Sequence, residues 1–311
     1  MGSGLLDHEP RWLGPLALTT IYVVWGSTYL AIRVMVEEIP PLLAAGSRFL
    51  VAGAILYAWI ALRRPRAVRA MTGRQLAAAA VVGLLLMFGG NGLVTVAEQE
   101  VPSGLAALLI ASVPLWVVLL RGALAAERVP LTTLLSVGIG FAGVALLVLP
   151  AERPDDAPLG WSLLVVLAAV LWATGSFTAS RLGRPPYLLT AVAWQMLIAG
   201  ATMVAVGLAT GEAADLHLGE VSLDSAAAFV FLILFGSIVA FTAYNWLLQH
   251  VAISTVSTYA FVNPVIAVLL GWSILAEEIT PFVALGTAVI VAAVAFVVLS
   301  PAERAPGAAG G

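Results

Sequence analysis

Hydrophobic runs of roughly twenty residues, separated by short polar or proline-containing segments, follow one another along almost the whole chain. A helix needs about 20 apolar residues to cross the hydrocarbon core of a bilayer. The pattern therefore predicts an all-α integral membrane protein with ten transmembrane helices. The predicted spans are 16–36, 41–62, 75–97, 103–125, 131–150, 159–179, 187–210, 226–248, 252–275 and 281–300.

Composition agrees with this pattern. Of the 311 residues, 61% are hydrophobic and only 10% are charged, whereas soluble domains carry about 25% charged residues. A soluble fold of this length could not enclose so much apolar surface, so the expected surroundings are a lipid bilayer. The connections between the predicted spans are short, and no soluble domain fits between them.

Arginine residues are distributed unequally between the two sets of loops. With a cytoplasmic N-terminus, ten arginines in loops or termini lie on the cytoplasmic side, and only Arg33 and Arg153 lie on the other side. Because basic residues in short loops remain cytoplasmic, both termini are predicted to be cytoplasmic. The first twelve residues lack the basic start of a signal peptide, so the first helix is expected to remain in the mature protein. The use of arginine without lysine is typical of a GC-rich bacterial genome, which favours the inner membrane of a bacterium.

An internal repeat divides the chain. A shift of 150 positions aligns Pro114 with Pro264 and Glu127 with Glu277. A repeat of five helices, an odd number, places its second copy upside down relative to the first. The sequence therefore predicts two inverted halves, at 1–152 and 153–311, which can exchange inward-open and outward-open states around a central site. The competing interpretation is a duplicated scaffold without transport.

The chain resembles a known group, the EamA-type family of the drug/metabolite transporter superfamily. The matching segments are WGSTYLAIR at 25–33, PPLLAAGSRFLVAG at 40–53, SGLAALLIASVPLWVVLLRGALAAERVP at 103–130 and ISTVSTYAFVNPVIAVLLGWSILAEEIT at 253–280. The resemblance covers nearly the whole chain. It implies ten helices in two inverted repeats, cytoplasmic termini and, most often, export of amino acids or other small metabolites. The second half departs from the first, with WATGSF at 172–177 and Gln195 where the first half has Arg48.

Amide and hydroxyl side chains form polar stripes on the predicted helices. Asn91, Thr95 and Gln99 are spaced by four on one face of the third span, and Asn245 occupies the position in the eighth span that corresponds to Thr95. Uncompensated burial of an amide is costly, so these side chains are expected to face the bundle interior. They form either a substrate-facing wall or hydrogen bonds that join helices.

In the predicted ninth span, Thr255, Tyr259 and Asn263 share a face, and Asn263 precedes Pro264. Proline removes a helical hydrogen bond and frees a carbonyl as a possible ligand. The matched Pro114 and Pro264 are therefore candidate gating hinges. Static curvature of the two helices is the alternative.

Aromatic residues mark the first span. Tyr22, Trp25 and Tyr29 lie on one face, and Trp172 stands at the corresponding place in the sixth span. Trp25 is roughly nine residues, or about 14 Å, into its helix, well away from the interface where tryptophan usually gathers. These rings either pack between helices or line a pocket for apolar or aromatic solutes.

The candidate charged residues are Arg48, Glu127 and Glu277. Arg48 lies seven residues into the second span, about 10 Å from its end. Its functional interpretation is that it binds a substrate carboxylate or closes an external gate. The alternative is that it makes a structural ion pair or extends its side chain to the surface. Glu127 and Glu277 precede Pro130 and Pro281. A structural role is favoured for both, as carboxylates at the N-terminus of the following helix.

The sequence lacks residues and motifs that several functions require, and this restricts the range of possible functions. No acidic residue lies well inside a predicted span, so proton coupling would have to use the carboxylates at the ends of spans, which are Glu98, Glu100, Glu127 and Glu277. The chain has no cysteine, phosphate-binding loop, dinucleotide fingerprint or histidine cluster, so no cofactor, metal or nucleic acid partner is expected.

We therefore predict a secondary transporter, not an enzyme, that exports amino acids or related metabolites by alternating access as a monomer or homodimer. The alternatives are an importer of the same solutes, a lipid-modifying enzyme and a scaffold without transport.

Overall fold

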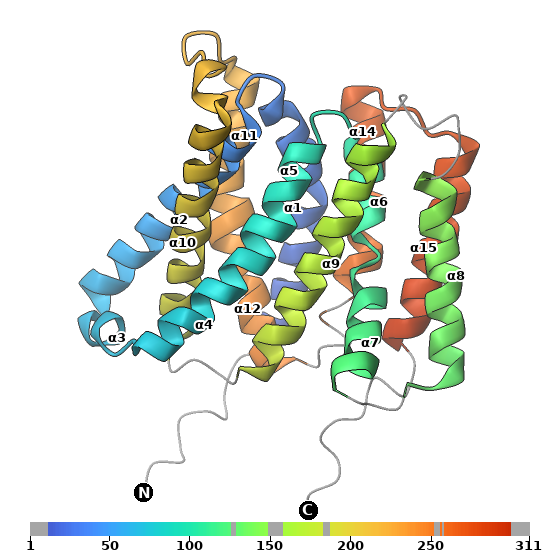
Figure 1. Ribbon diagram of the computed structural model, residues 1–311, viewed down its shortest axis with the longest axis horizontal. Coiled ribbons are helices and arrows are strands. Elements are labelled where there is room, and N and C mark those ends of the chain that lie inside the picture. Colours follow the sequence, from blue (N-terminus) through green and yellow to red (C-terminus); the bar gives the residue numbers. More distant parts are fainter. Residues whose placement is uncertain are drawn as a thin grey trace, which may run out of the picture.

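The computed structural model describes residues 12–125, 129–148, 158–182, 187–251, 256 and 258–299. In this part of the chain the backbone forms helices and turns and no strand. The helices stand roughly side by side in one bundle (Figure 1). A helix bonds all of its central N–H and C=O groups internally, which is what a hydrocarbon environment demands.

Each half contributes several helices in sequence order. The first half contains α1 (Leu13–Val36), α2 (Pro41–Arg63), α3 (Pro65–Arg69), α4 (Gly73–Gly83), η1 (Leu84–Gly92), α5 (Leu93–Ala97), α6 (Ser103–Ile110), α7 (Val113–Leu124) and α8 (Leu131–Val148). The second contains α9 (Leu159–Arg181), α10 (Leu188–Thr210), η3 (Glu212–Ala214), α11 (Leu223–Phe231), η4 (Leu232–Val239), α12 (Ala240–His250), α14 (Tyr259–Leu275) and α15 (Pro281–Leu299).

Among the described residues, seven helical segments are long and apolar enough to cross a membrane. Three shorter apolar helices lie within the remaining predicted spans, at Leu131–Leu146, Val262–Leu275 and Pro281–Phe296. The all-helical membrane fold is thus confirmed, while the number of ten crossings stays a prediction.

The two helices that carry the matched prolines differ in the structure. The fourth predicted span is divided, because α6 ends at Ile110 and α7 begins at Val113, one residue before Pro114, which has no N–H to continue the ladder. Pro264 instead lies inside α14, which continues past it. The matched prolines therefore have different effects on the two helices.

A feature that the periodicity did not indicate is π-helical backbone in the third and eighth predicted spans. The segment η1 joins α4 to α5, and η4 joins α11 to α12. Such segments are rare and are frequently found at functional sites. Both occur at corresponding places in the two halves.

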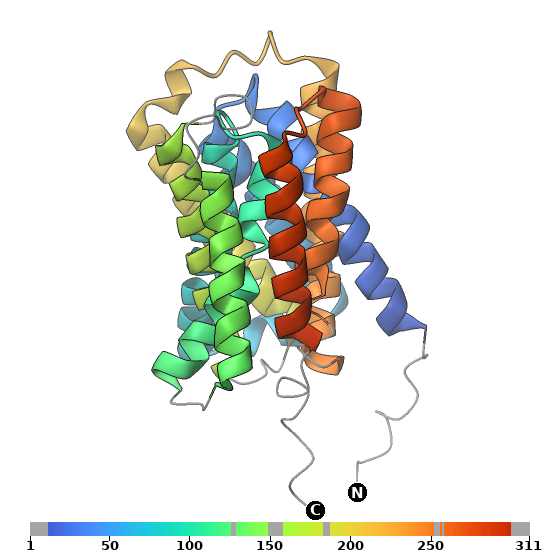
Figure 2. The same ribbon diagram turned by 90° about the vertical axis from the view of Figure 1, so that its right-hand side faces the viewer.

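The packing of the helices is reciprocal between the halves. The helix α2 packs against α10, and α8 packs against α15 (Figures 1 and 2). The helix α1 packs on α11, α12 and α14 of the second half, while α9 packs on η1, α5, α6 and α7 of the first. Each half is therefore completed by helices of the other.

Glycine permits the close crossing of α2 and α10. A Cβ added to Gly200 would lie 2.8 Å from the carbonyl oxygen of Gly46 and 2.8 Å from the backbone nitrogen of Leu50. A Cβ on Gly46 would in turn lie 2.9 Å from the Gly200 oxygen. Small residues let helix backbones approach closely in membranes, where dispersion contacts drive association. The two helices thus meet backbone to backbone.

This geometry predicts opposite effects for two glycine-to-alanine substitutions. Gly200→Ala should destabilise the protein by about 1–3 kcal/mol, because backbone atoms cannot move aside for the methyl group. Gly138→Ala in α8, where nothing lies within 4 Å of the added Cβ, should be neutral or stabilise by up to about 1 kcal/mol. Thermal unfolding of both variants in the same detergent measures the difference, and equal melting temperatures would contradict the close crossing.

Candidate functional site

Four aromatic side chains from three other helices surround Trp25, which is only 7% exposed. The Trp25 ring centroid lies 5.8 Å from Trp172, 5.4 Å from Phe241, 4.9 Å from Tyr244 and 5.5 Å from Tyr259. We call these five residues the aromatic cluster. Edge-on and tilted ring pairs at such distances are favourable contacts. Since α1 belongs to one half and α9, α12 and α14 to the other, the cluster lies at their interface.

Three of the five residues are predicted by the sequence. Trp25, Trp172 and Tyr259 were candidates, and the structure brings them together. Phe241 and Tyr244 were not candidates, although their spacing of three places them on one face of α12. In a chain so rich in apolar residues, that spacing does not stand out.

The remaining aromatic candidates on α1 lie on either side of Trp25. The hydroxyl group of Tyr22 is hydrogen-bonded to the Thr258 hydroxyl group, which ties α1 to the residue before α14. The Trp25 Nε1 donates to the carbonyl oxygen of Gly236 in η4 at 3.4 Å. Tyr29 is half-buried one turn farther along. The face of α1 that carries these rings therefore contacts the second half.

Arg48 is buried in the bundle, with 2% of its surface exposed. Its Nη2 donates to Asn91 Oδ1 at 2.6 Å, and its Cζ lies 4.3 Å from the centroid of the Phe49 ring. Its Nε and Nη1 have no hydrogen-bond partner among the described residues. The interpretation that Arg48 extends to the surface is therefore wrong. Phe49 packs on Phe241 with centroids 5.9 Å apart, so it links Arg48 to the aromatic cluster.

The predicted polar stripe on the third span is only partly correct. Asn91 faces inward to Arg48, and Thr95 is buried with its Oγ1 donating to the Asn91 carbonyl oxygen at 2.9 Å. Gln99 is exposed, because α5 ends at Ala97 and helical periodicity does not extend to it. The buried polar residue at this helix end is Glu98, whose exposed fraction is 0%. The placement of Gln99 on an interior wall is thus wrong.

The polar candidates of the second half have different surroundings. Asn245 Nδ2 donates to the Phe241 carbonyl oxygen of its own helix at 2.8 Å, which is neither a helix-joining bond nor a free donor. Asn263 is buried, and its Oδ1 has no partner within the described part of the chain. Thr255 and Glu127 lie outside the described residues.

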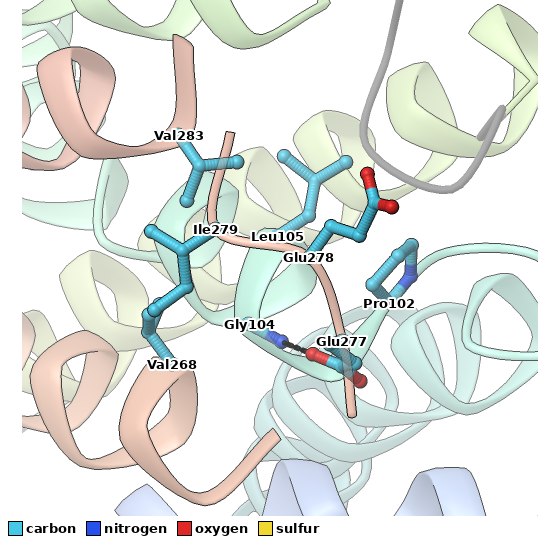
Figure 3. A pocket seen from close by; sticks show the side chains of 8 residues that line it. All are labelled: Pro102, Gly104, Leu105, Val268, Glu277, Glu278, Ile279 and Val283. Carbon is cyan, nitrogen blue, oxygen red and sulfur yellow. Dashed lines mark hydrogen bonds between the residues drawn. The ribbon is translucent and has the colours of Figure 1, made fainter. Parts of the chain in front are cut away.

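Glu277 is at the N-terminus of a helix, but not of the predicted one. Its Oε1 accepts from Ser103 N at 2.7 Å. Its Oε2 accepts from Gly104 N at 3.0 Å (Figure 3). Both nitrogens belong to the first turn of α6. The expected position at the start of α15 is therefore wrong. The chain reverses at Ala276, which has a left-handed φ of 56°, and Glu277 N donates to the Gly271 carbonyl oxygen at 3.1 Å. This reversal turns the carboxylate toward the neighbouring helix α6.

Two further carboxylates act in the same way at this end of the bundle, the upper end in Figure 1. Glu212 accepts from the backbone nitrogens of Leu42 and Leu43 in the first turn of α2, at 3.1 and 2.8 Å. Glu38 accepts from Ser222 N at 2.7 Å, and this bond, with those from the Ser225 and Ser222 side chains, lowers the pKa of Glu38. The first N–H groups of a helix have no partner in the helix, and a carboxylate there is favourable. These three contacts join the loops of the upper end to neighbouring helices.

These features define a class of protein, a helical membrane protein whose two halves share a buried polar and aromatic interior. Residues 12–149 and 159–299 each match the EamA-like transporter family. The chain belongs to this family and is a membrane transporter, not an enzyme.

Relatives of known sequence agree with this assignment. The chain is 39% identical over 292 residues to the Escherichia coli K12 protein named uncharacterized inner membrane transporter YedA, covering 93% of this chain and 92% of that protein. It is 24% identical over 285 residues to the Salmonella typhimurium LT2 protein named probable amino-acid metabolite efflux pump, covering 90% of this chain and 92% of that protein. A solved structure with 22% identity matches with a TM-score of 0.64 over 92% of this chain and 97% of that chain, which supports the fold alone.

The contact of Glu277 with α6 predicts a stability effect. Glu277→Ala should lower the free energy of unfolding by about 1 kcal/mol, the usual effect of removing a helix cap, because two backbone N–H groups lose their acceptor. Glu278→Ala is the matched control, since Glu278 is the next residue and is exposed. Thermal unfolding of the two variants in detergent checks the prediction. An equal effect of both substitutions would argue against the cap.

Proposed function

We propose that the protein exports amino acids or other small metabolites that carry a carboxylate, by alternating access across a bacterial inner membrane. The observation that supports this function best is Arg48, a buried cation beside the aromatic cluster, two of whose nitrogens have no partner among the residues that the structure describes. Export of amino-acid metabolites is also what the name of the Salmonella relative states for that protein.

The chemistry of Arg48 suits a carboxylate ligand. A guanidinium group presents several N–H donors in one plane and binds carboxylates through two parallel hydrogen bonds. Keeping this cation inside a membrane helix is costly, so such residues usually pair with a partner or bind a substrate. Asn91 satisfies one nitrogen of Arg48 and leaves two available.

The aromatic cluster suits the apolar part of such a substrate. Aromatic side chains commonly line ligand sites, with a few polar groups that orient the ligand. In this structure the rings contact one another, so binding requires that they move apart. Because the rings belong to helices of both halves, such a movement would change how the two halves pack against each other.

Alternating access rests on the two halves, 1–152 and 153–311, being inverted repeats. The two separate ranges that match the family support this division. The reciprocal packing of α1 and α9 and the π-helical segments η1 and η4 support it as well. Pro114 and Pro264, at matched positions, are the candidate hinges.

Location and orientation are part of the same proposal. The excess of arginine in one set of loops supports cytoplasmic termini. The name of the Escherichia coli relative assigns that protein to the inner membrane. The upper end of the bundle is then the external side. A monomer and a homodimer are both compatible with the proposal.

Flux measurements in proteoliposomes test this function. Radiolabelled amino acids, offered singly as a panel, should exchange across the membrane in vesicles containing the protein and not in empty vesicles. Vesicles of known protein orientation, assayed in both directions, separate export from the alternative, import of the same solutes. Absence of exchange for every compound of the panel would overturn the proposed substrate class.

Substitution of Arg48 tests the proposed role of its guanidinium. Arg48→Gln keeps a hydrogen-bonding group and removes the charge, so it should reduce exchange about 10–100-fold, as expected when a charged hydrogen bond worth about 1.5–3 kcal/mol is lost. The control is Arg63→Gln, at the exposed end of the same helix. If the Arg48 variant exchanged all panel compounds at the rate of the control, Arg48 would not bind substrate.

A further inference from the structure

Glu98 differs from the other carboxylates at the upper end of the bundle. It follows the last residue of α5 and is fully buried, and neither carboxylate oxygen accepts a hydrogen bond from the described part of the chain. Glu38, Glu212 and Glu277 each accept from backbone nitrogens. A buried carboxylate without donors is an unfavourable place for a negative charge. The fold thus holds Glu98 without the bonds that normally stabilise its ionised form.

Three charged side chains act on Glu98. Arg33 belongs to α1, Arg48 to α2, and Glu277 to the segment after α14. Arg33 donates to the backbone carbonyl oxygens of Glu98 and Gln99, and Arg48 donates to Asn91. The hydrogen bonds of both cations are therefore directed away from the carboxylate of Glu98.

Burial raises the pKa of Glu98 well above its usual range. The nearby Glu277 carboxylate raises this pKa further, and the guanidinium groups of Arg33 and Arg48 lower it in part. Ionisation of Glu98 in the folded protein therefore lowers the free energy of unfolding, and this loss is complete at pH values above the folded-state pKa of Glu98. The loss disappears as the pH falls from that pKa toward the ordinary pKa of glutamate.

We propose that Glu98 binds and releases a proton during the transport cycle, exchanging it with the solution at the upper end of the bundle. The next two residues, Gln99 and Glu100, are exposed, so the route to this surface is short. In the step, an O–H bond of a hydronium ion breaks, its proton forms an O–H bond with a carboxylate oxygen of Glu98, and a neutral water molecule and a neutral carboxylic acid result. No electron is transferred, and no bond of the protein breaks. Coupling of this step to flux rests on the proposed transport function, whereas proton binding itself does not.

Infrared titration of the purified protein tests proton binding without any substrate. The wild type should show the carbonyl stretch of a protonated carboxylic acid at pH values where exposed glutamates are ionised. This band should be missing in Glu98→Gln and present in Glu100→Gln, the matched control two residues away. A band that is equal in the wild type and in Glu98→Gln would overturn the proposal.

A second variant keeps the test decisive if Glu98→Gln does not fold. Arg48→Gln removes a cation that lowers the pKa of Glu98, so the midpoint of the band should shift to higher pH. A midpoint that is unchanged or shifts to lower pH would contradict the assignment of the band to Glu98.

Flux assays test the coupling separately. For an amino acid that the wild type exchanges, a pH gradient should change the rate of net transport. Glu98→Gln should lose this dependence and retain exchange at equal pH, while Glu100→Gln should behave like the wild type. If Glu98→Gln kept the full response to the gradient, coupling at this residue would be refuted, even if export of amino acids held.

Discussion

A bilayer contains no water with which buried polar groups can form hydrogen bonds, and this constraint organises the whole molecule. The central backbone groups are satisfied within helices, but the first N–H groups of each helix are not. At the upper end of the bundle, carboxylates from neighbouring segments accept several of them. Glu212 does so for α2 and Glu277 for α6. The loops at this end are therefore held to the helices by charge-assisted hydrogen bonds.

The same constraint makes charged residues inside the bundle unusual and therefore candidates for a functional role. Most buried side chains are apolar, and Arg48 and Glu98 are charged residues that are almost completely enclosed. Each has polar atoms without a partner in the described structure. Both come from the first half. Arg48 lies about two turns into α2, and Glu98 directly follows α5. This asymmetry is already present in the sequence, because Gln195 replaces arginine in the second half.

The aromatic cluster links this polar region to the interface between the halves. Phe49 lies against the Arg48 guanidinium and also packs on Phe241. Phe241 in turn contacts Trp25 and Trp172. A ligand that displaces these rings would therefore disturb contacts between helices of both halves. That connection is what a transporter requires, because binding must alter the relative stability of its conformations.

Much of the site can be predicted because polar and aromatic residues are rare inside apolar spans. Trp25, Trp172, Tyr259, Arg48 and Asn91 stand out for this reason, and the structure buries Trp25, Tyr259 and Arg48 and half-buries Trp172 and Asn91. The predictions fail at helix ends. Periodicity places Gln99 on the polar stripe, but α5 stops two residues earlier, and the buried residue is Glu98. A shift of one position at a helix end changes which side chain faces inward, and periodicity cannot locate such an end.

The sequence by itself determined the membrane environment, the helical class and the family, since these depend on composition, on the length of apolar runs and on motifs that are local in the chain. Only the tertiary structure decided which helix each carboxylate meets. Glu277 precedes α15 in sequence but binds α6, because a left-handed residue reverses the chain there. The tertiary structure likewise decided that Glu98 is enclosed without a donor from the described part of the chain, since burial depends on helices that are distant in sequence. Hydrophobic pattern is a property of neighbours along the chain, whereas the partner of a polar group is set by how the helices pack.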